Sequence, residues 1–231
     1  MSSVIDAVFA GVDALRRLTV EVHERAAGEG RLPGTADLAS IRPTVFQHLA
    51  SGVPVISGTG VIAAPGSLAD RPRWLEWWRT PRGSAAPRPL TVDLDPHHIG
   101  GYEYTSTTWF DKPRRTGQRV VVGPYVDYAG TDEYILTFSC PIRSAERFLG
   151  VAAADVRTSD LEAMMLPLLD AVAPVCLLVN ATGRVITSNT VDAIAGALVP
   201  ERLRRSSRIP VAQDGTPCEG LPWYLIWING E

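Results

Sequence analysis

The chain has 231 residues, enough for one domain with a substantial core, or for one domain with a small appendage. Apolar residues make up 45% of the sequence and charged residues 20%, as in ordinary globular proteins. A formal net charge of −3 gives no electrostatic attraction to nucleic acid or to an anionic membrane, so neither is expected as a partner.

The three cysteines give no sign of a disulfide framework or a zinc site. Cys140, Cys176 and Cys218 are widely spaced and odd in number, and the first two lie in apolar runs typical of buried thiols. The N-terminal residues lack the pattern of a signal peptide, and no apolar run is long enough to span a bilayer. These observations predict a soluble, cytoplasmic protein.

Two helices are predicted near the N-terminus. Apolar residues recur at helical spacing from Ser3 to about Ala27, with Gly28 and Gly30 ending the pattern. The apolar stripe of this helix is wider than a lone surface helix needs, so a homodimer formed through it is one expectation. A second helix is predicted from Pro43 to Leu49, with proline in its first turn.

The next segment reads as a strand followed by a tryptophan-rich helix. Val53 to Ala64 has strand character interrupted by glycines, which mark a close approach of another group to the backbone. Three tryptophans between Trp74 and Trp78 would share one face of a short helix, forming a local core or, as the alternative, walling a pocket. A loop to Pro89 and a strand from Leu90 to Leu94 are expected next.

The centre of the chain predicts a solvated basic loop and two strands. The loop runs from Asp111 to Gln118, and the strands cover Tyr134 to Pro141 and Phe148 to Val156.

The last third predicts helices around a hairpin. Ser159 and Glu162 form a capping box that opens a helix. A hairpin is expected from Val175 to Ser188, and a short helix from Thr190 to Leu198.

No motif of an enzyme, a metal site or a cofactor site is present, so no catalytic residue, metal or cofactor is expected. Asp127 lies between Tyr125 and Tyr128, just after a Gly-Pro turn, where a buried carboxylate needs a cation or several donors. Two sources of the cation stay open. One is a nearby arginine, Arg114 or Arg119, and the other is a ligand ammonium group between aromatic rings.

An ordered set of residues across the centre of the chain resembles the Cache (PDC) sensor domains of chemoreceptors, histidine kinases and some transcription regulators. The set is Trp109-Phe110, Pro124-Tyr125-x-Asp127, Ile135-x-Thr137-x-Ser139-x-Pro141-Ile142, Gly150-Val151 and Asp155. The resemblance implies an α+β fold, with a PAS-like antiparallel sheet preceded by a long helix. It further implies a small second α/β unit, as in double-Cache proteins, in a truncated form.

The resemblance divides the chain into residues 1–157, a ligand-sensing domain with its N-terminal helix, and residues 158–231, a connecting helix and a partial second PAS-like module. It implies a pocket lined by Trp109, Tyr125 and Asp127, with Asp127 receiving a ligand amine and Tyr104 joining them.

Two departures from the family pattern bear on the ligand. Where the amino-acid-binding branch carries an arginine and a tyrosine around the tryptophan, this chain has Thr107 and Phe110. The clamp for a ligand carboxylate is therefore missing, and an amine or an uncharged metabolite is favoured over an α-amino acid. The expected function is a non-catalytic small-molecule sensor in signalling. A protein–protein interaction domain without a ligand is the alternative, and an enzyme ranks third.

Overall fold

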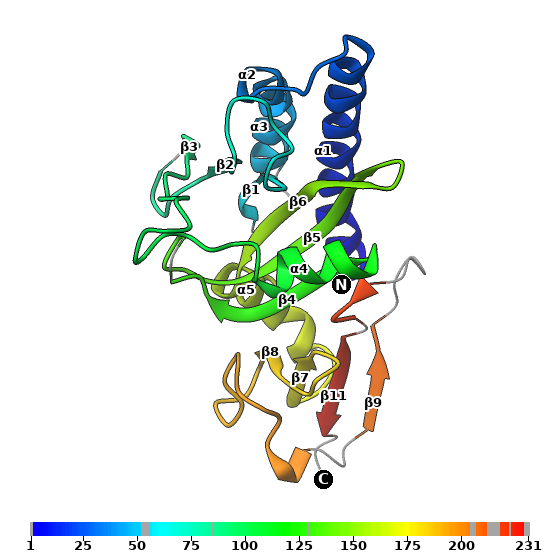
Figure 1. The fold of residues 1–231 in the computed structure, drawn as a ribbon. Coiled ribbons are helices and arrows are strands. Elements are labelled where there is room, and N and C mark those ends of the chain that lie inside the picture. Colours follow the sequence, from blue (N-terminus) through cyan, green and yellow to red (C-terminus); the bar gives the residue numbers. More distant parts are fainter. Residues whose placement is uncertain are drawn as a thin grey trace.

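The computed structural model describes residues 2–51, 56–84, 86–128, 130–203, 207–211, 218–221 and 223–228. It contains two sheets joined by a helix, and Figure 1 shows the sheets lying one beyond the other along the molecule. The first part holds α1 (Ser2–Gly28), α2 (Thr35–Leu38), η1 (Ala39–Ile41), α3 (Arg42–Ala50), β1 (Ile56–Ala63), β2 (Leu75–Arg79), β3 (Arg88–Pro89), α4 (Thr108–Thr116), β4 (Arg119–Val126), β5 (Tyr134–Ser144) and β6 (Arg147–Arg157).

The second part begins with the connecting helix and contains mostly short strands. Its elements are α5 (Thr158–Asp170), β7 (Val175–Val179), β8 (Val185–Ser188), η2 (Glu201–Leu203), β9 (Ser207–Pro210), β10 (Cys218–Glu219) and β11 (Tyr224–Ile228). The chain is thus an α+β protein with a long N-terminal helix, as the sequence predicts.

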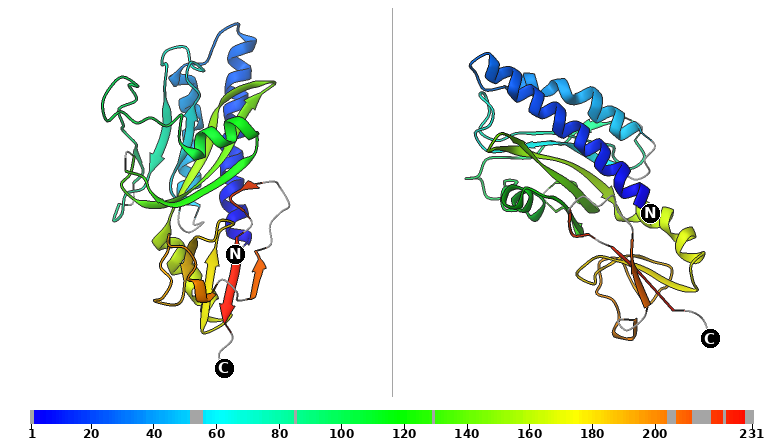
Figure 2. Two further views of the ribbon diagram at one scale, coloured as in Figure 1. Left: turned by 60° about the horizontal axis from the view of Figure 1, so that its bottom comes forward. Right: turned by 90° about the vertical axis from the view of Figure 1, so that its right-hand side faces the viewer.

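The first sheet has seven strands in the order β10-β4-β5-β6-β1-β2-β3. All of its pairings are antiparallel except the short contact between β10 and β4. Helices α1 and α3 cover one face of this sheet and α4 lies against the other, as the right-hand view of Figure 2 shows. We call these the helix face and the cavity face.

Alternation along the strands separates the two faces. On β6, Ala152, Ala154 and Val156 belong to the large core under α1, whereas Val151 and Ala153 belong to a second cluster on the cavity face. The apolar stripe of α1 packs into the first of these cores, with Phe9 edge-to-face against Phe138 at a centroid distance of 5.4 Å. Burial of this stripe explains why a 27-residue amphipathic pattern forms a helix here.

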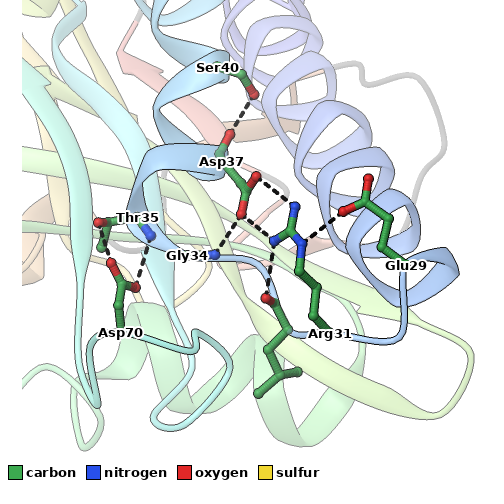
Figure 3. A network of polar contacts seen from close by, with 8 residues as sticks. Glu29, Arg31, Gly34, Thr35, Asp37, Ser40 and Asp70 are labelled. Carbon is green, nitrogen blue, oxygen red and sulfur yellow. Dashed lines mark hydrogen bonds and ion pairs between the residues drawn. The ribbon is translucent and has the colours of Figure 1, made fainter.

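A polar network fixes the turn that follows α1 (Figure 3). The guanidinium of Arg31 contacts Asp37 through two nitrogens, at 2.6 and 3.1 Å, and Asp37 also accepts the backbone N–H of Gly34 at 2.8 Å. Thr35 donates its N–H and its hydroxyl to Asp70, at 2.9 and 2.7 Å. The network thereby ties the entry of α2 to the loop between β1 and β2.

The tryptophan-rich run is a strand and not the predicted helix. On β2, Glu76 and Trp78 face α3, where Glu76 accepts a hydrogen bond of 2.7 Å from Arg42 and one of 2.8 Å from the Trp78 indole. Trp77 points to the cavity face, opposite Gly60 on β1. The pairing with glycine-containing β1 explains why this run forms a strand, because the bulky Trp77 indole requires a neighbour without a side chain.

Three other predicted elements differ from the structure. The expected basic loop after Asp111 is part of helix α4, whose last turn carries Arg114 and Arg115 paired with Asp111. Residues 90–94 are irregular instead of a strand, and residues 190–198 form turns and bends instead of a helix. The start of the strand predicted from Val53 lies outside the described residues.

The second sheet has four antiparallel strands in the order β8-β7-β11-β9. The predicted hairpin from Val175 to Ser188 is present as β7 and β8. After β9 the chain returns to the first sheet, where Trp223 is 2% exposed and lies edge-to-face to Phe138. Among the described helices, none is both long enough and apolar enough to cross a bilayer.

Candidate ligand-binding site

A small internal cavity lies on the cavity face of the first sheet, beneath α4 and the segment that leads to it. Its volume is about 20 Å³, which is room for roughly one water molecule. Its walls combine aliphatic, aromatic, hydroxyl and carboxylate groups: Ile62, Leu75, Trp77, Leu90, Tyr102, Trp109, Tyr125, Asp127, Thr137, Ala153 and Asp155.

Three of the four residues predicted for the pocket line this cavity. Trp109 enters from the first turn of α4, and Tyr125 and Asp127 from the end of β4. Tyr104 is not among the lining residues. It is fully buried behind the cavity, where its hydroxyl donates to the carbonyl of Ala63 at 2.9 Å and its ring packs against Phe110.

A β-bulge in β4 places Tyr125 on the cavity face. Val122 pairs with Thr137, but Tyr125 pairs with Ile135, so β4 has one more residue than β5 between the two pairs. Because side chains alternate along a strand, the extra residue turns Tyr125 away from the helix face. Its hydroxyl then lies 2.8 Å from the hydroxyl of Thr137.

Asp127 is buried, and no cationic side chain contacts it among the residues that the structure describes. One of its carboxylate oxygens accepts hydrogen bonds from the N–H and hydroxyl of Thr131, at 2.9 and 3.2 Å, and the other accepts the hydroxyl of Tyr102 at 3.4 Å. Burial raises the pKa of Asp127, and these hydrogen bonds partly offset the rise.

Neither arginine that the sequence offers as a partner contacts Asp127. Arg114 pairs with Asp111, and the Arg119 guanidinium lies over the ring of Phe9, 4.3 Å from its centroid. Of the two cation sources left open by the sequence, the first is thus not observed for either of the two arginines it named.

Asp155 is the second carboxylate of the cavity. Thr137 donates to it at 2.7 Å, and Tyr125 is hydrogen-bonded to Thr137 in turn. Burial raises the pKa of Asp155 to about 8, against the effect of the Thr137 hydrogen bond, and the negative charges of Asp127 and Glu133 act in the same direction as burial.

The sequence singles out Asp127 and offers the tryptophans around Trp77 as a pocket wall only as an alternative, and it does not place Tyr102 or Asp155 in the pocket. A signal for Asp155 exists in the sequence, because it continues the alternation of Val151 and Ala153 and is the polar member of that face. Trp77 carries no such signal, since its position depends on the pairing of β2 with β1.

The lining residues define the chemistry of the site. Two carboxylates, three hydroxyls and several aromatic faces surround the cavity, and no lysine, arginine or histidine is among its described lining residues. Such walls suit a cation that is small enough to be enclosed by aromatic rings. Thr107 and Phe110 stand where the amino-acid-binding pattern has an arginine and a tyrosine, and neither can hold a ligand carboxylate here. The Thr107 hydroxyl donates to the carbonyl of Tyr104, and Phe110 packs inside the aromatic core.

A larger groove lies elsewhere, between the end of β6, α5 and residues 188–195. Its volume is about 910 Å³, but it is open and its central arginine is already neutralised, since Arg157 pairs with Glu133 at 2.9 Å. The smaller cavity is the stronger candidate, because burial and unneutralised carboxylates occur there together.

Comparison with known proteins gives this architecture a family context. Residues 91–163 match the family model described as "Methyl-accepting chemotaxis protein-like, first PDC sensor domain". Seven of the cavity residues fall inside the matched range, among them both carboxylates.

Three solved structures share the fold over nearly the whole chain. A methyl-accepting chemotaxis protein X has a TM-score of 0.66 and 15% identity, over 97% of this chain and 91% of that one. The extracellular domain of the putative histidine kinase mmHK1S-Z3 has a TM-score of 0.64 and 15% identity, over 96% and 88%. The ligand-binding domain of the Pseudomonas aeruginosa PAO1 amino acid chemoreceptor PctC, solved with GABA, has a TM-score of 0.61 and 20% identity, over 99% and 93%.

These comparisons correct the predicted location. The prediction of a cytoplasmic protein is wrong, because the matching structures are extracellular sensor domains of histidine kinases and ligand-binding domains of chemoreceptors. The misleading observation was the free cysteines. Cys140 and Cys176 are 3% and 0% exposed, so the surrounding protein shields both thiols and they carry no information about the redox compartment.

Residues 91–163 thus match a PDC sensor family model, and the chain as a whole shares the fold of chemoreceptor and histidine kinase sensor domains.

Proposed function

We propose that the chain is a non-catalytic sensor domain that acts outside the cytoplasm, and that its cavity binds a small organic amine between Asp127 and Asp155. The observation that carries the proposal is the pair of buried carboxylates in one cavity whose described lining residues include no cationic side chain. A ligand ammonium group would supply the missing charge, and the rings of Trp109 and Tyr125 would enclose it.

The ligand is proposed to be an amine and not an α-amino acid. An α-carboxylate would need donors or a cation, whereas the described walls offer two further carboxylates. The solved chemoreceptor domain with GABA shows that this fold accommodates an amine-bearing ligand in another protein.

Binding requires the cavity to open, since about 20 Å³ is far below the volume of an organic ligand. The segment between β2 and α4 supplies Leu90 and Tyr102 to the wall, and its described residues contain a single two-residue strand. Outward movement of this segment would enlarge the cavity and disturb only the short edge strand β3 of the sheet. Signalling is then a population shift, in which the amine favours the open form.

A second candidate function follows from the same small volume. A cavity of this small volume is also what an interaction domain without any ligand would show, with aromatic rings as core and Asp155 kept protonated. The two candidates differ in whether any amine stabilises the protein.

The deciding experiment is thermal unfolding of the purified chain with a panel of short amines, amino acids and uncharged analogues. An amine at one hundred times its dissociation constant should raise the melting temperature by about 5 to 10 °C. Asp127→Asn and Asp155→Asn should remove the shift. Asp13→Asn, on the exposed side of α1 and paired with Arg16, is the matched control and should keep it. The absence of a shift with every amine would leave the interaction domain as the function.

A further inference from the structure

One buried donor on the cavity wall has no acceptor. Trp77 is 5% exposed, and its indole N–H makes no hydrogen bond. The two neighbouring indoles, of Trp74 and Trp78, both donate to Glu76 on the opposite face of β2, at 3.3 and 2.8 Å. Buried donors are nearly always paired, because an unpaired one forfeits its hydrogen bond to water.

The position of this N–H relative to Asp155 follows from the strand pairing. A side chain at Gly58 would begin 2.9 Å from the Trp77 Nε1, so the indole occupies the space that this glycine leaves free. Gly58 pairs directly with Asp155 across β1 and β6. Directly paired residues project on the same face, with Cβ atoms about 5 Å apart. Gly58, which the indole covers, is thus a neighbour of Asp155 on the cavity face, and both Trp77 and Asp155 line the cavity.

We propose that the Trp77 indole N–H is a ligand-binding donor, and that the site prefers a small amine with an adjacent neutral hydrogen-bond acceptor over an alkylamine of equal size. The inference rests on the proposed function, in which Asp127 and Asp155 receive the ammonium group. An amino alcohol or amino amide has the required chemistry. Its nitrogen reaches the carboxylates while its oxygen, about two carbons away, accepts the indole N–H.

The acceptor is neutral because of the charges around it. A ligand carboxylate at the indole would lie next to Asp155, with no lysine, arginine or histidine among the described lining residues to offset the repulsion. A hydroxyl or amide oxygen avoids this repulsion and still satisfies the donor.

The test compares 2-aminoethanol with propylamine, which has the same number of heavy atoms but a methyl group in place of the hydroxyl. Calorimetric titration of the full chain should give a ratio of the two affinities that favours 2-aminoethanol. In Trp77→Phe, which lacks the N–H, this ratio should fall by about two- to tenfold, the range of one hydrogen bond. The comparison of ratios cancels the effect of the smaller ring, because both amines lose the same packing.

Trp78→Phe is the matched control. Trp78 is half-buried and lies on the other face of β2, where its indole N–H donates to Glu76. The affinity ratio of this variant should therefore equal that of the unchanged chain. A second readout avoids any folding defect of the variants. The Trp77 indole N–H resonance of the isotopically labelled chain should shift downfield with 2-aminoethanol and much less with propylamine.

The possible results distinguish a failure of the Trp77 donor role from a failure of the proposed function. Equal affinity ratios in the unchanged chain and Trp77→Phe, or an indole resonance that does not respond to 2-aminoethanol, would overturn the donor role while amine binding stands. If neither amine binds, the proposed function fails and the donor role fails with it.

Discussion

At the scale of single residues, the cavity is defined by two carboxylates that the fold buries in the same place by different means. Asp127 lies at the end of β4 and is held by Tyr102 and Thr131, whereas Asp155 lies within β6 and is held by Thr137. Burial raises the pKa of both carboxyl groups, and it raises that of Asp155 to about 8.

The raised pKa of Asp155 predicts how stability depends on pH. Between the ordinary pKa of an aspartate, about 4, and its folded value of about 8, the folded protein binds one more proton than the unfolded chain. The free energy of unfolding should therefore fall as pH rises through this range. His48, whose pKa burial lowers to about 4, and His23, also lowered, act in the opposite direction but only below about pH 6.5.

The window for this prediction is from about pH 6.5 to about pH 8. A hydrogen bond to Asp93 raises the pKa of His98, so His98 acts in the same direction as Asp155 there, and both chains to be compared should carry His98→Asn. Urea unfolding of the ligand-free chain should show stability decreasing across that window, and Asp155→Asn should flatten the curve. The same decrease in the variant would show that Asp155 is not the group responsible.

The affinity for an amine ligand should change with pH in the opposite direction from the stability of the ligand-free chain. A cation beside Asp155 favours the ionised carboxylate, so amine affinity should increase from about pH 6 to pH 8, as long as the amine itself stays protonated. Calorimetric titration at several pH values measures the trend. Affinity that is independent of pH would mean that the amine does not contact this carboxylate.

A local signal in the sequence singles out Asp127 as a residue of interest. The Gly-Pro turn and the flanking tyrosines indicate Asp127, and the structure places Asp127, Tyr125 and Trp109 around one cavity. Trp77 and Tyr102 could not be placed from the sequence, because each enters the cavity through a partner far along the chain: β1 for Trp77 and Asp127 for Tyr102.

At the scale of elements, the prediction of a helix at the tryptophan run is wrong because these residues fit both a helical and a strand periodicity. Trp74, Trp77 and Trp78 match a helical face, but Leu75 and Trp77 also match one face of a strand. The choice is made by β1, whose glycines leave room for Trp77. Long amphipathic and β-branched runs have no such ambiguity, and α1, β5 and β6 are confirmed close to their predicted bounds.

The contact between α1 and α3 offers an element-scale prediction. His48 of α3 is buried, its Nδ1 lies 3.1 Å from the Thr59 hydroxyl, and its ring fills the space beside Gly11 of α1. A Cβ at Gly11 would lie 2.1 Å from that ring. Gly11→Ala should therefore destabilise the protein by roughly 1–3 kcal/mol, despite the better helix propensity of alanine.

Gly28→Ala is the control for that substitution. Gly28 is the last residue of the same helix, and a Cβ there would meet nothing within 4 Å. Urea unfolding should show little or no destabilisation for Gly28→Ala. Equal stability of the two variants would contradict the packing of His48 against Gly11.

At the scale of the whole molecule, the two sheets are linked by more than α5. The C-terminal part of the chain returns to the first sheet, where β10 pairs with β4 and Trp223 packs on Phe138. The division into residues 1–157 and 158–231 therefore stays a proposal about modules, and the return of the chain makes the first module depend on residues of the second. The double-Cache arrangement and the homodimer through α1 also stay predictions.

Because the first module depends on residues of the second, a substitution near the C-terminus should also destabilise the first sheet. Trp223→Ala should reduce the free energy of unfolding by about 3–5 kcal/mol, the cost of emptying a large buried site. Hydrogen exchange should show the loss in β5 as well as in β11. Faster exchange confined to residues 175–228 would show that the second unit unfolds independently.

The most direct test of the account is a crystal structure of the full chain grown with 2-aminoethanol. We predict the amine nitrogen within hydrogen-bonding distance of Asp127 and Asp155, in a cavity enlarged by outward movement of the wall that carries Leu90 and Tyr102. An unchanged cavity of about 20 Å³, with the amine absent or bound in the open groove beside α5, would contradict it.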